Sequence, residues 1–348
     1  MSWFEYTGAL HVHSRYSDGG GTVERIIKAA HKAQLDFVIL TDHETLKGRD
    51  RWQGWHDGLL LVVDEEISPW IGNHYLALGI KNEIRAKMAL RAQPFIDEVR
   101  RQGGVGIIAH PFGEKKGLFP VLDRPWIDWD AVGFDGMEIW SYMYDWIKDL
   151  TLLTLPYYLL HPSEAIDGPR PQTLAKWDEL NLSRKVIGVC GLDAHAKKLP
   201  FLPFVEILPY EYLLRTLRNH ILLEEPLDPT SPQRSISAIH EAIRRGSCFI
   251  GYDLIADSTG FLFKGEMAGM ELNMGDERPF VGRATLRVKT PAPARIRVLR
   301  NGEPILERVE SEVEIGVNSP GVYRAEAYLG GKPWILSNPI YLRPSRSA

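Results

Sequence analysis

The stretch Gly8-Ala9-Leu10-His11-Val12-His13 opens a short apolar strand and ends in two histidines. Side chains alternate in direction along a strand, so His11 and His13 point to the same face and can bind one cation. Taken alone, such a pair is more often two ordinary surface histidines. Whether this pair chelates a metal therefore depends on the residues that follow it in the chain.

Short apolar runs alternate with helical patterns from residue 8 to about residue 250. This alternation is typical of β-α units, and it predicts a largely parallel sheet or barrel. Thr22 is placed to cap the first expected helix. The expected strands cover residues 8–12, 37–40, 59–63, 74–79, 105–109, 136–140 and 186–190, and the expected helices cover residues 22–33, 94–102 and 172–180.

Residue types that bind metals stand where the expected strands end. His43 follows the strand at 37–40, and His110 follows the strand at 105–109. In parallel α/β barrels the carboxyl ends of the strands meet at one face, so residues distant in sequence are expected to converge there. The candidate metal ligands are His11, His13, Asp18, His43, Glu66, His74, His110, Asp193 and His195.

This set combines six of the 11 histidines with three carboxylates. It is too large for one tetrahedral ion and suits two or three divalent ions. Three such ions with three carboxylates would leave a local charge of roughly +3, which favours an anionic ligand such as phosphate. The remaining histidines are expected to be surface or structural residues; they are His31, His56, His161, His220 and His240.

Charged residues near these motifs have two possible roles each. Asp42 could orient a histidine as a carboxylate behind the ligands, or cap the turn that follows it. Arg15, Lys47 and Arg49 come just after ligand motifs, so they could contact a phosphate, although solvated loop charges are the simpler interpretation.

Composition bounds the class of protein. The 348 residues include 44% hydrophobic and 25% charged residues, as in an ordinary globular protein. The formal net charge of -4 favours no nucleic acid partner larger than a nucleotide-sized substrate. Neither a signal peptide nor a membrane span is recognised, so a cytoplasmic protein is expected. The two cysteines, Cys190 and Cys248, are expected to be buried strand residues without a disulfide.

Two domains are expected, at residues 1–252 and 253–348. The first contains an insert at about residues 113–184 that is rich in Trp and Tyr, which either shapes a substrate pocket or forms the core of the insert. The second alternates strands with turn signals such as Asn301-Gly302 and Gly330-Gly331, which predicts a small antiparallel β-sandwich, immunoglobulin-like in type.

The order of seven short motifs resembles the polymerase-and-histidinol-phosphatase (PHP) superfamily over about residues 6 to 250. The β-sandwich and the closing Ser337-Asn338-Pro339-Ile340-Tyr341 resemble the CehA/McbA-type metallohydrolases, a group named for carbaryl hydrolases. The motifs that carry the resemblance are His11-x-His13, Ser17-Asp18-Gly19, Thr41-Asp42-His43, Glu66-Ile67-Ser68, His74, Ala109-His110-Pro111 and Asp193-Ala194-His195.

The resemblance implies a distorted (β/α)7 barrel with a trinuclear site of zinc, manganese or iron. Glu66 is preferred to Glu65 as the ligand because the family pattern has the glutamate directly before Ile-Ser. Glu138 stands where the family often has an acidic residue, and it is carried as a candidate site residue. The implied groups are His11, His13, Glu66 and Asp193 for one ion, Glu66, His74 and His110 for a second, and Asp18, His43 and His195 for a third.

These features predict hydrolysis by a water that is activated between two ions, with His195 as one candidate for protonating the leaving group. The leading hypothesis is a phosphoesterase acting on a small phosphorylated metabolite or nucleotide. A carboxylic or carbamate ester hydrolase is the alternative enzyme, because an aryl leaving group suits a pocket of Trp and Tyr. A noncatalytic, metal-stabilised module is the third hypothesis, and the complete ligand set argues against it.

Overall fold

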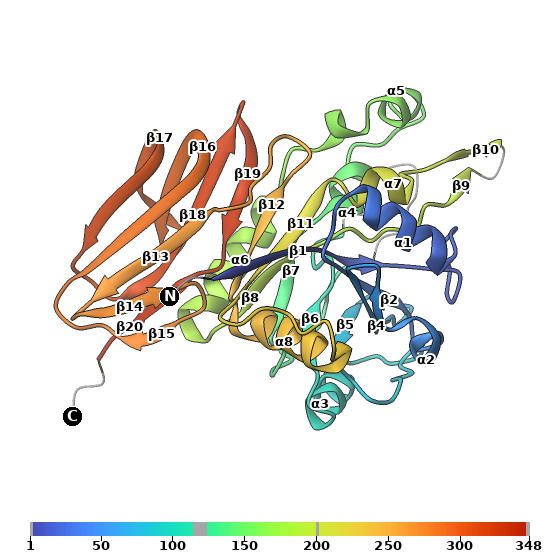
Figure 1. The fold of residues 1–348 in the computed structure, drawn as a ribbon, viewed down its shortest axis with the longest axis horizontal. Helices are drawn as coiled ribbons and strands as arrows, with labels where there is room; N and C mark the ends of the chain where they lie inside the picture. The colour runs from blue at the N-terminus through green and yellow to red at the C-terminus, as the bar shows by residue number, and fades with distance from the viewer. Residues whose placement is uncertain (1–2, 114–123, 200–201, 346–348) are drawn as a thin grey trace.

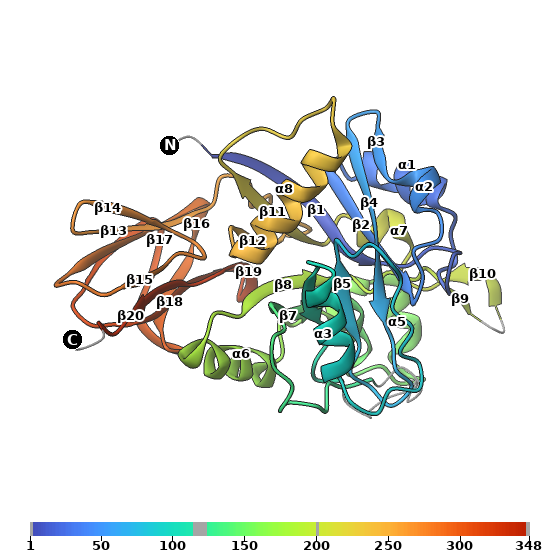
Figure 2. The same ribbon diagram turned by 90° about the horizontal axis from the view of Figure 1, so that it is seen from below.

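The computed structural model describes residues 3–113, 124–199 and 202–345 of the chain. Both ribbon views show two parts next to each other (Figures 1 and 2): strands β1 to β8 with their surrounding helices, and the strand-rich C-terminal part. The helices are α1 (Val23–Lys32), α2 (Arg49–Trp52), α3 (Gln93–Arg101), α4 (Tyr142–Ile147), α5 (Leu155–Leu160), α6 (Pro171–Ser183), α7 (Tyr210–Leu213) and α8 (Pro232–Arg245).

Seven strands of the first part lie in a row, and each overlaps a strand predicted from the sequence. The β1-β2-β4 pairs and the β6-β7-β8 pairs are parallel. The row is largely parallel, as expected, and β5 is the exception because it runs antiparallel to both of its neighbours. The row consists of β1 (Phe4–Val12), β2 (Phe37–His43), β4 (Leu59–Ile67), β5 (Tyr75–Leu78), β6 (Val105–Ile108), β7 (Gly136–Ser141) and β8 (Ile187–Gly191).

The segment that follows β8 is hydrogen-bonded to β1, at the opposite end of this row. The amides of Leu192 and Ala194 donate to the carbonyl oxygens of Leu10 and His11 at 3.0 and 3.1 Å, and the amide of His13 donates to Ala194 at 3.0 Å. These bonds bring the Asp193-Ala194-His195 motif next to the His-x-His motif, although 180 residues separate them in the sequence.

Three of the helices, α1, α3 and α6, overlap the helices predicted from the sequence, whereas α8 was not predicted. The Thr22 hydroxyl caps α1 by accepting a hydrogen bond from the amide of Arg25, as expected. α8 inserts Ile239 and Ile243 among buried side chains of the strands, such as Val62. Each fully buried aliphatic side chain of this kind contributes about 1.5–3 kcal/mol. The packed strands therefore form a rigid base for the loops at their ends.

The C-terminal part has its own hydrophobic core, which includes Phe263, Tyr323 and Trp334. The predicted hairpin at Asn301-Gly302 is confirmed, with both residues in the left-handed region at φ of 54° and 86°. The expectation of purely antiparallel pairing is wrong for β15 and β20, which are parallel. Its strands are β13 (Leu262–Met267), β14 (Met270–Asn273), β15 (Glu277–Pro279), β16 (Ala284–Arg300), β17 (Glu303–Val317), β18 (Gly321–Leu329), β19 (Lys332–Ser337) and β20 (Ile340–Arg343).

One continuous 18-stranded sheet joins the two parts, because β12 pairs with β19. The side-chain amide of Asn338 accepts from the amide of Gly188 at 2.8 Å and donates to its carbonyl oxygen at 2.9 Å. Gly188 lies in β8, the strand that leads to Asp193. The C-terminal part thus supports a strand of the candidate site. The remaining strands are β3 (Gly54–His56), β9 (Lys198–Leu199), β10 (Leu202–Glu206), β11 (Leu217–Leu223) and β12 (Cys248–Tyr252).

Side chains of the aromatic insert lie both in the core and beside a cavity. Trp126 and Trp177 are buried core residues, whereas Tyr144 and Trp146 of α4 line a cavity. Residues 114–123 of the predicted insert lie outside the described residues.

Cys190 and Cys248 are buried and unpaired, as predicted. The described helices are all too short or too polar to cross a membrane.

Candidate metal centre

The nine candidate ligands converge at the carboxyl ends of β1, β2, β4 and β8 and at the loops beside β5 and β6. Their possible ligand atoms form three groups, and within each group all of these atoms lie within 4.8 Å of one another. His13 and Glu66 each belong to two groups, so the groups adjoin. The groups are His11, His13, Glu66 and Asp193; Glu66, His74 and His110; and His13, Asp18, His43 and His195.

The first group has the dimensions of a tetrahedral site. The Nε2 atoms of His11 and His13 lie 3.2 and 3.3 Å from Oε2 of Glu66. The same two nitrogens lie 3.4 and 3.3 Å from Oδ1 of Asp193. Ligands about 2.0–2.1 Å from a zinc ion would stand ~3.3 Å apart along each tetrahedral edge. The four observed separations therefore fit a small divalent cation.

Unpartnered atoms point to the same conclusion. Within the described residues, Nε2 of His11, both ring nitrogens of His13 and Oε2 of Glu66 are buried without a hydrogen-bond partner. Buried polar atoms without partners are rare because they lose their hydration without compensation. The donor set consists of imidazole nitrogens and carboxylate oxygens, which zinc, manganese and iron accept. The residues present thus fit a metal.

Glu66 lies between two groups. Its Oε2 atom faces the first group, whereas its Oε1 atom lies 2.8 Å from Nδ1 of His74 and 3.3 Å from Nε2 of His110. A carboxylate in this position can bridge two cations. The side chain is almost fully buried on β4, so its direction is fixed by the strand.

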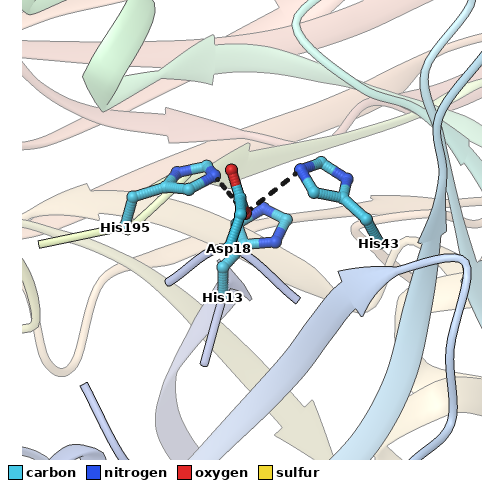
Figure 3. A group of neighbouring side chains, drawn as sticks. All are labelled: His13, Asp18, His43 and His195. Atoms are coloured by element: carbon cyan, nitrogen blue, oxygen red, sulfur yellow. Dashed lines mark ion pairs between the residues drawn. The ribbon is translucent and has the colours of Figure 1, made fainter. Parts of the chain in front are cut away.

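The third group is the most open of the three (Figure 3). Oδ1 of Asp18 lies 3.4 Å from Nε2 of His43 and 3.1 Å from Nε2 of His195, as the dashed lines show. The Asp18 side chain is 41% exposed, whereas His13 is fully buried behind it. Lys197 places its Nζ atom 2.5 Å from the other Asp18 oxygen.

The protonation states of His13 and Glu66 favour cation binding, whereas at His11 the carboxylates of Glu138, Glu66 and Asp193 outweigh burial and raise the pKa, so a cation would replace a proton on that imidazole. Burial, assisted by repulsion from His195 and His43, lowers the pKa of His13 to about 3, so this imidazole is neutral near pH 7. Burial opposes ionisation of Glu66, but His11 and His74 outweigh it and hold the pKa of that carboxyl well below its usual range. Neutral imidazoles and ionised carboxylates are the forms that bind metals.

Glu138, a candidate site residue from the sequence, holds two of the candidate ligands in place. Its Oε1 atom lies 2.6 Å from Nδ1 of His11, and its Oε2 atom accepts the backbone N–H of His110 at 2.7 Å. The carboxylate thereby turns Nε2 of His11 toward the first group. A glycine is required opposite, because a Cβ atom on Gly191 would stand 1.8 Å from Oε1 of Glu138.

Asp42 differs from both of its predicted roles, because its carboxylate binds no histidine and caps no helix among the described residues. It accepts hydrogen bonds from the amide and hydroxyl of Ser14 at 2.8 and 2.6 Å. It also accepts from the amide and hydroxyl of Ser17 at 3.0 and 2.6 Å. These bonds fix the loop that carries Asp18. In this structure Asp42 therefore organises the loop that carries a candidate ligand.

The three basic residues considered for phosphate binding lie away from the cavity beside the ligands. Arg49 turns inward and donates to the carbonyl oxygens of Val63 and Ile80 at 2.6–2.9 Å. Arg15 is exposed and its Nε atom donates to a carbonyl of its own loop, and Lys47 is exposed. None of the three lines the cavity, so their contact with a substrate stays a prediction.

Strained backbone and two further side chains were not foreseen. His11, His110 and Asp193 have φ of 66°, 28° and 50°, in the left-handed region that residues with a Cβ atom seldom adopt. Such strain persists at functional sites where the surrounding structure enforces it. The Ser68 hydroxyl lies 2.6 Å from Nδ1 of His43, and its place in the Glu66-Ile67-Ser68 motif is the only sequence signal for it. The Tyr210 hydroxyl, which no signal marks, binds the loops of the third group.

A cavity of about 470 Å³ adjoins the three groups. Tyr144 forms part of its wall and stacks on the ring of His110, with centroids 4.2 Å apart. This size suits a small organic ligand. Besides the ligands, its lining includes Arg124, Met143, Tyr144, Trp146, Ile147, Lys197, Lys198 and Ile207.

Comparison with known proteins gives a family match in the N-terminal part. The sequence profile of the PHP domain family matches residues 9–109, a segment that contains six of the nine candidate ligands. An uncharacterised protein of Methanocaldococcus jannaschii is 28% identical over 145 residues, which cover 38% of this chain and 80% of that protein.

Two crystal structures show a distant likeness. One is a two-domain protein from Bacteroides vulgatus described as containing a predicted PHP-like metal-dependent phosphoesterase. It is 13% identical, with a TM-score of 0.45 and coverage of 97% of this chain and 96% of that chain. The other, PsfC from Pseudomonas syringae, is 14% identical, with a TM-score of 0.41 and coverage of 68% and 89%.

Proposed function

We propose that this chain is a metal-dependent hydrolase of the PHP type that cleaves a small phosphorylated compound. The observation that carries the proposal is the first group, in which four ligand atoms stand at tetrahedral spacing and three of them, on His11, His13 and Glu66, are buried without a hydrogen-bond partner among the described residues. The match of the PHP domain profile to residues 9–109 supports the same class.

We assign the three groups to two or three divalent ions of zinc, manganese or iron, with Glu66 as the bridging ligand. We also interpret the seven strands as the distorted (β/α)7 barrel of that family, and the C-terminal part as an immunoglobulin-like sandwich. The hydrogen bonds between β1 and the segment after β8 support the first interpretation.

The ions would supply Lewis acidity and a water of lowered pKa. The chain's own residues arrange the rest. Asp42 fixes the Asp18 loop, and Glu138 fixes His11. His195 borders the cavity, and it is our candidate for passing a proton to the leaving oxygen. The excess of positive charge at such a site would bind the phosphoryl group and stabilise the charge that develops on it.

A carboxylic or carbamate ester hydrolase is the second candidate, and the α4 wall of the cavity favours it. Met143, Trp146 and Ile147 present apolar surface there. An uncharged aryl ester would bury its ring against such a wall.

An assay of hydrolysis separates these candidates. Chromogenic phosphate monoesters, phosphate diesters and aryl carbamates would be incubated with Mn²⁺- or Zn²⁺-loaded protein and with chelator. We expect monoester turnover that the chelator abolishes. Faster turnover of the carbamates would favour the second candidate, and no turnover of any substrate by metal-loaded protein would contradict both.

A further inference from the structure

The cavity beside the ligands has two unlike walls. One wall carries the three candidate metal groups together with Lys197 and Lys198, at the start of the β9–β10 hairpin. A second wall is α4, with Met143, Trp146 and Ile147. Among the described lining residues, the carboxylates are all candidate ligands. Apart from Arg124 and Ile207, the charged lining residues belong to the candidate metal groups or to the Lys197-Lys198 segment, and the other lining side chains come from α4.

The charged wall suits a dianion. Oδ1 of Asp18 faces His43 and His195, whereas Oδ2 is bound by Nζ of Lys197 at 2.5 Å. This ammonium group lies at the edge of the third group and borders the cavity. An anionic oxygen held at that group would be within reach of Lys197, which adds a charge-assisted hydrogen bond.

The apolar wall suits a carbon skeleton with few hydroxyl groups. Met143 and Trp146 are held by a helix that continues β7 directly, so the wall is preformed. A polyol placed against it would lose hydration without equivalent hydrogen bonds, whereas a flat apolar group would release water from both surfaces. A volume of about 470 Å³ accommodates a phosphate and one ring.

We propose that the substrate is a phosphate monoester of a small apolar or aromatic alcohol, with the phosphate against the metal groups and Lys197 and the alcohol against α4. This inference rests on the proposed phosphoesterase function. Hydrolysis forms one P–O bond to water and breaks the P–O bond to the alcohol, which leaves with a proton. The products are inorganic phosphate and the apolar alcohol.

Phosphate esters of two primary alcohols test the preference for an apolar alcohol, because their leaving groups are chemically alike. We expect kcat/KM for benzyl phosphate to exceed that for glucose 6-phosphate by about tenfold or more. Ile147→Asn and, as a second variant, Met143→Gln should reduce kcat/KM for benzyl phosphate by about tenfold and narrow its advantage over glucose 6-phosphate. Circular dichroism and metal content would confirm that each variant is folded and loaded.

Binding of non-hydrolysable phosphonates tests the inference without turnover. Calorimetry should show benzylphosphonate binding about tenfold more tightly than methylphosphonate. Lys197→Met should weaken both phosphonates and raise KM for both esters, whereas Lys47→Met, at an exposed position away from the cavity, should change neither.

The outcomes distinguish this inference from the function on which it rests. Equal or better turnover of glucose 6-phosphate would overturn the inference and leave the phosphoesterase intact. Faster hydrolysis of neutral benzyl acetate than of benzyl phosphate would overturn the inference that the substrate carries a phosphate. No hydrolysis of any phosphate ester by metal-loaded protein would overturn the proposed function itself.

Discussion

Two buried clusters of histidine and carboxylate differ in how completely their atoms are partnered. In the second cluster, His220 places Nδ1 2.7 Å from Glu5, and its Nε2 lies 3.1 Å from Asp253 and 2.9 Å from the Ser258 hydroxyl. In the metal centre, both nitrogens of His13 lack a hydrogen-bond partner within the described residues. The His220 cluster is complete as a set of protein atoms, whereas the atoms around His13 are left unpartnered in an arrangement that fits a cation.

The backbones of the two clusters also differ, because only the candidate metal centre is strained. His220 lies in regular strand structure and pairs with both β1 and β12. His11 and Asp193 have left-handed φ values that cost about 1–3 kcal/mol each. The comparison teaches that burial and charge are common to both clusters, whereas unpartnered ligand atoms and enforced strain distinguish the candidate metal centre.

The largest expected effect comes from removing a ligand of the first group. His13→Ala and Asp193→Ala should each abolish metal-dependent hydrolysis and reduce bound metal, because the four-atom set is broken. Elemental analysis and kcat/KM would measure this. His220→Ala, in the complete cluster, should keep its full metal content. Undiminished turnover in both ligand variants would show that the centre has been placed wrongly.

The variant Glu138→Gln tests the positioning of His11 with a side chain of nearly the same shape as the native one. The amide can donate to Nδ1 of His11, which would place the ring proton on Nε2, where the metal should bind. We expect metal affinity to fall by about 10- to 100-fold, as measured by calorimetry.

Glu65→Gln is the matched control for this variant. Burial raises the pKa of Glu65 to about 8, so the native side chain is already mostly neutral near pH 7. Metal affinity should therefore stay the same. A loss of affinity in both variants, or in neither, would refute the positioning role of Glu138.

Metal addition should stabilise the whole protein. A ligand present at 100 times its Kd adds about 2.7 kcal/mol to the free energy of unfolding. We expect Tm of the native protein to rise with Mn²⁺ or Zn²⁺ and to fall with chelator, measured by scanning fluorimetry. The His13→Ala variant should respond much less, and an equal response would place the stabilising ions elsewhere.

The smallest expected effect is the pH dependence of the His220 cluster. Burial lowers the pKa of His220, but Asp253 and Glu5 outweigh it and raise the pKa above 6.5. Arg218 also contacts Asp253, with its guanidinium 3.5 Å from the carboxylate. The folded state therefore gains stability from the protonated ring below about pH 6.5, and loses that gain as pH rises through the folded pKa.

Urea midpoints from pH 6 to 9, with chelator present, would show this effect as the difference between the native protein and His220→Gln. The native protein should lose its advantage as pH rises. A difference that stays constant, or grows, would contradict the charged state of His220.

The sequence predicts the strands and the convergence of the ligands, because His43 and His110 occur where apolar runs stop. The direction of β5 could not be predicted from the sequence, since this four-residue strand carries no signal for antiparallel pairing. The hydrogen-bond partners of Asp42 could not be predicted either, because they come from a loop 25 to 28 residues away. The inward turn of Arg49 depends on carbonyls that only the folded chain brings together.

Anomalous diffraction from crystals grown with Mn²⁺ or Zn²⁺ tests the central claim most directly. We predict a peak between Nε2 of His11, Nε2 of His13, Oε2 of Glu66 and Oδ1 of Asp193, about 2.0–2.2 Å from each atom. Absence of that peak in metal-saturated crystals, with the four atoms still converging, would contradict the assignment of this site to a metal.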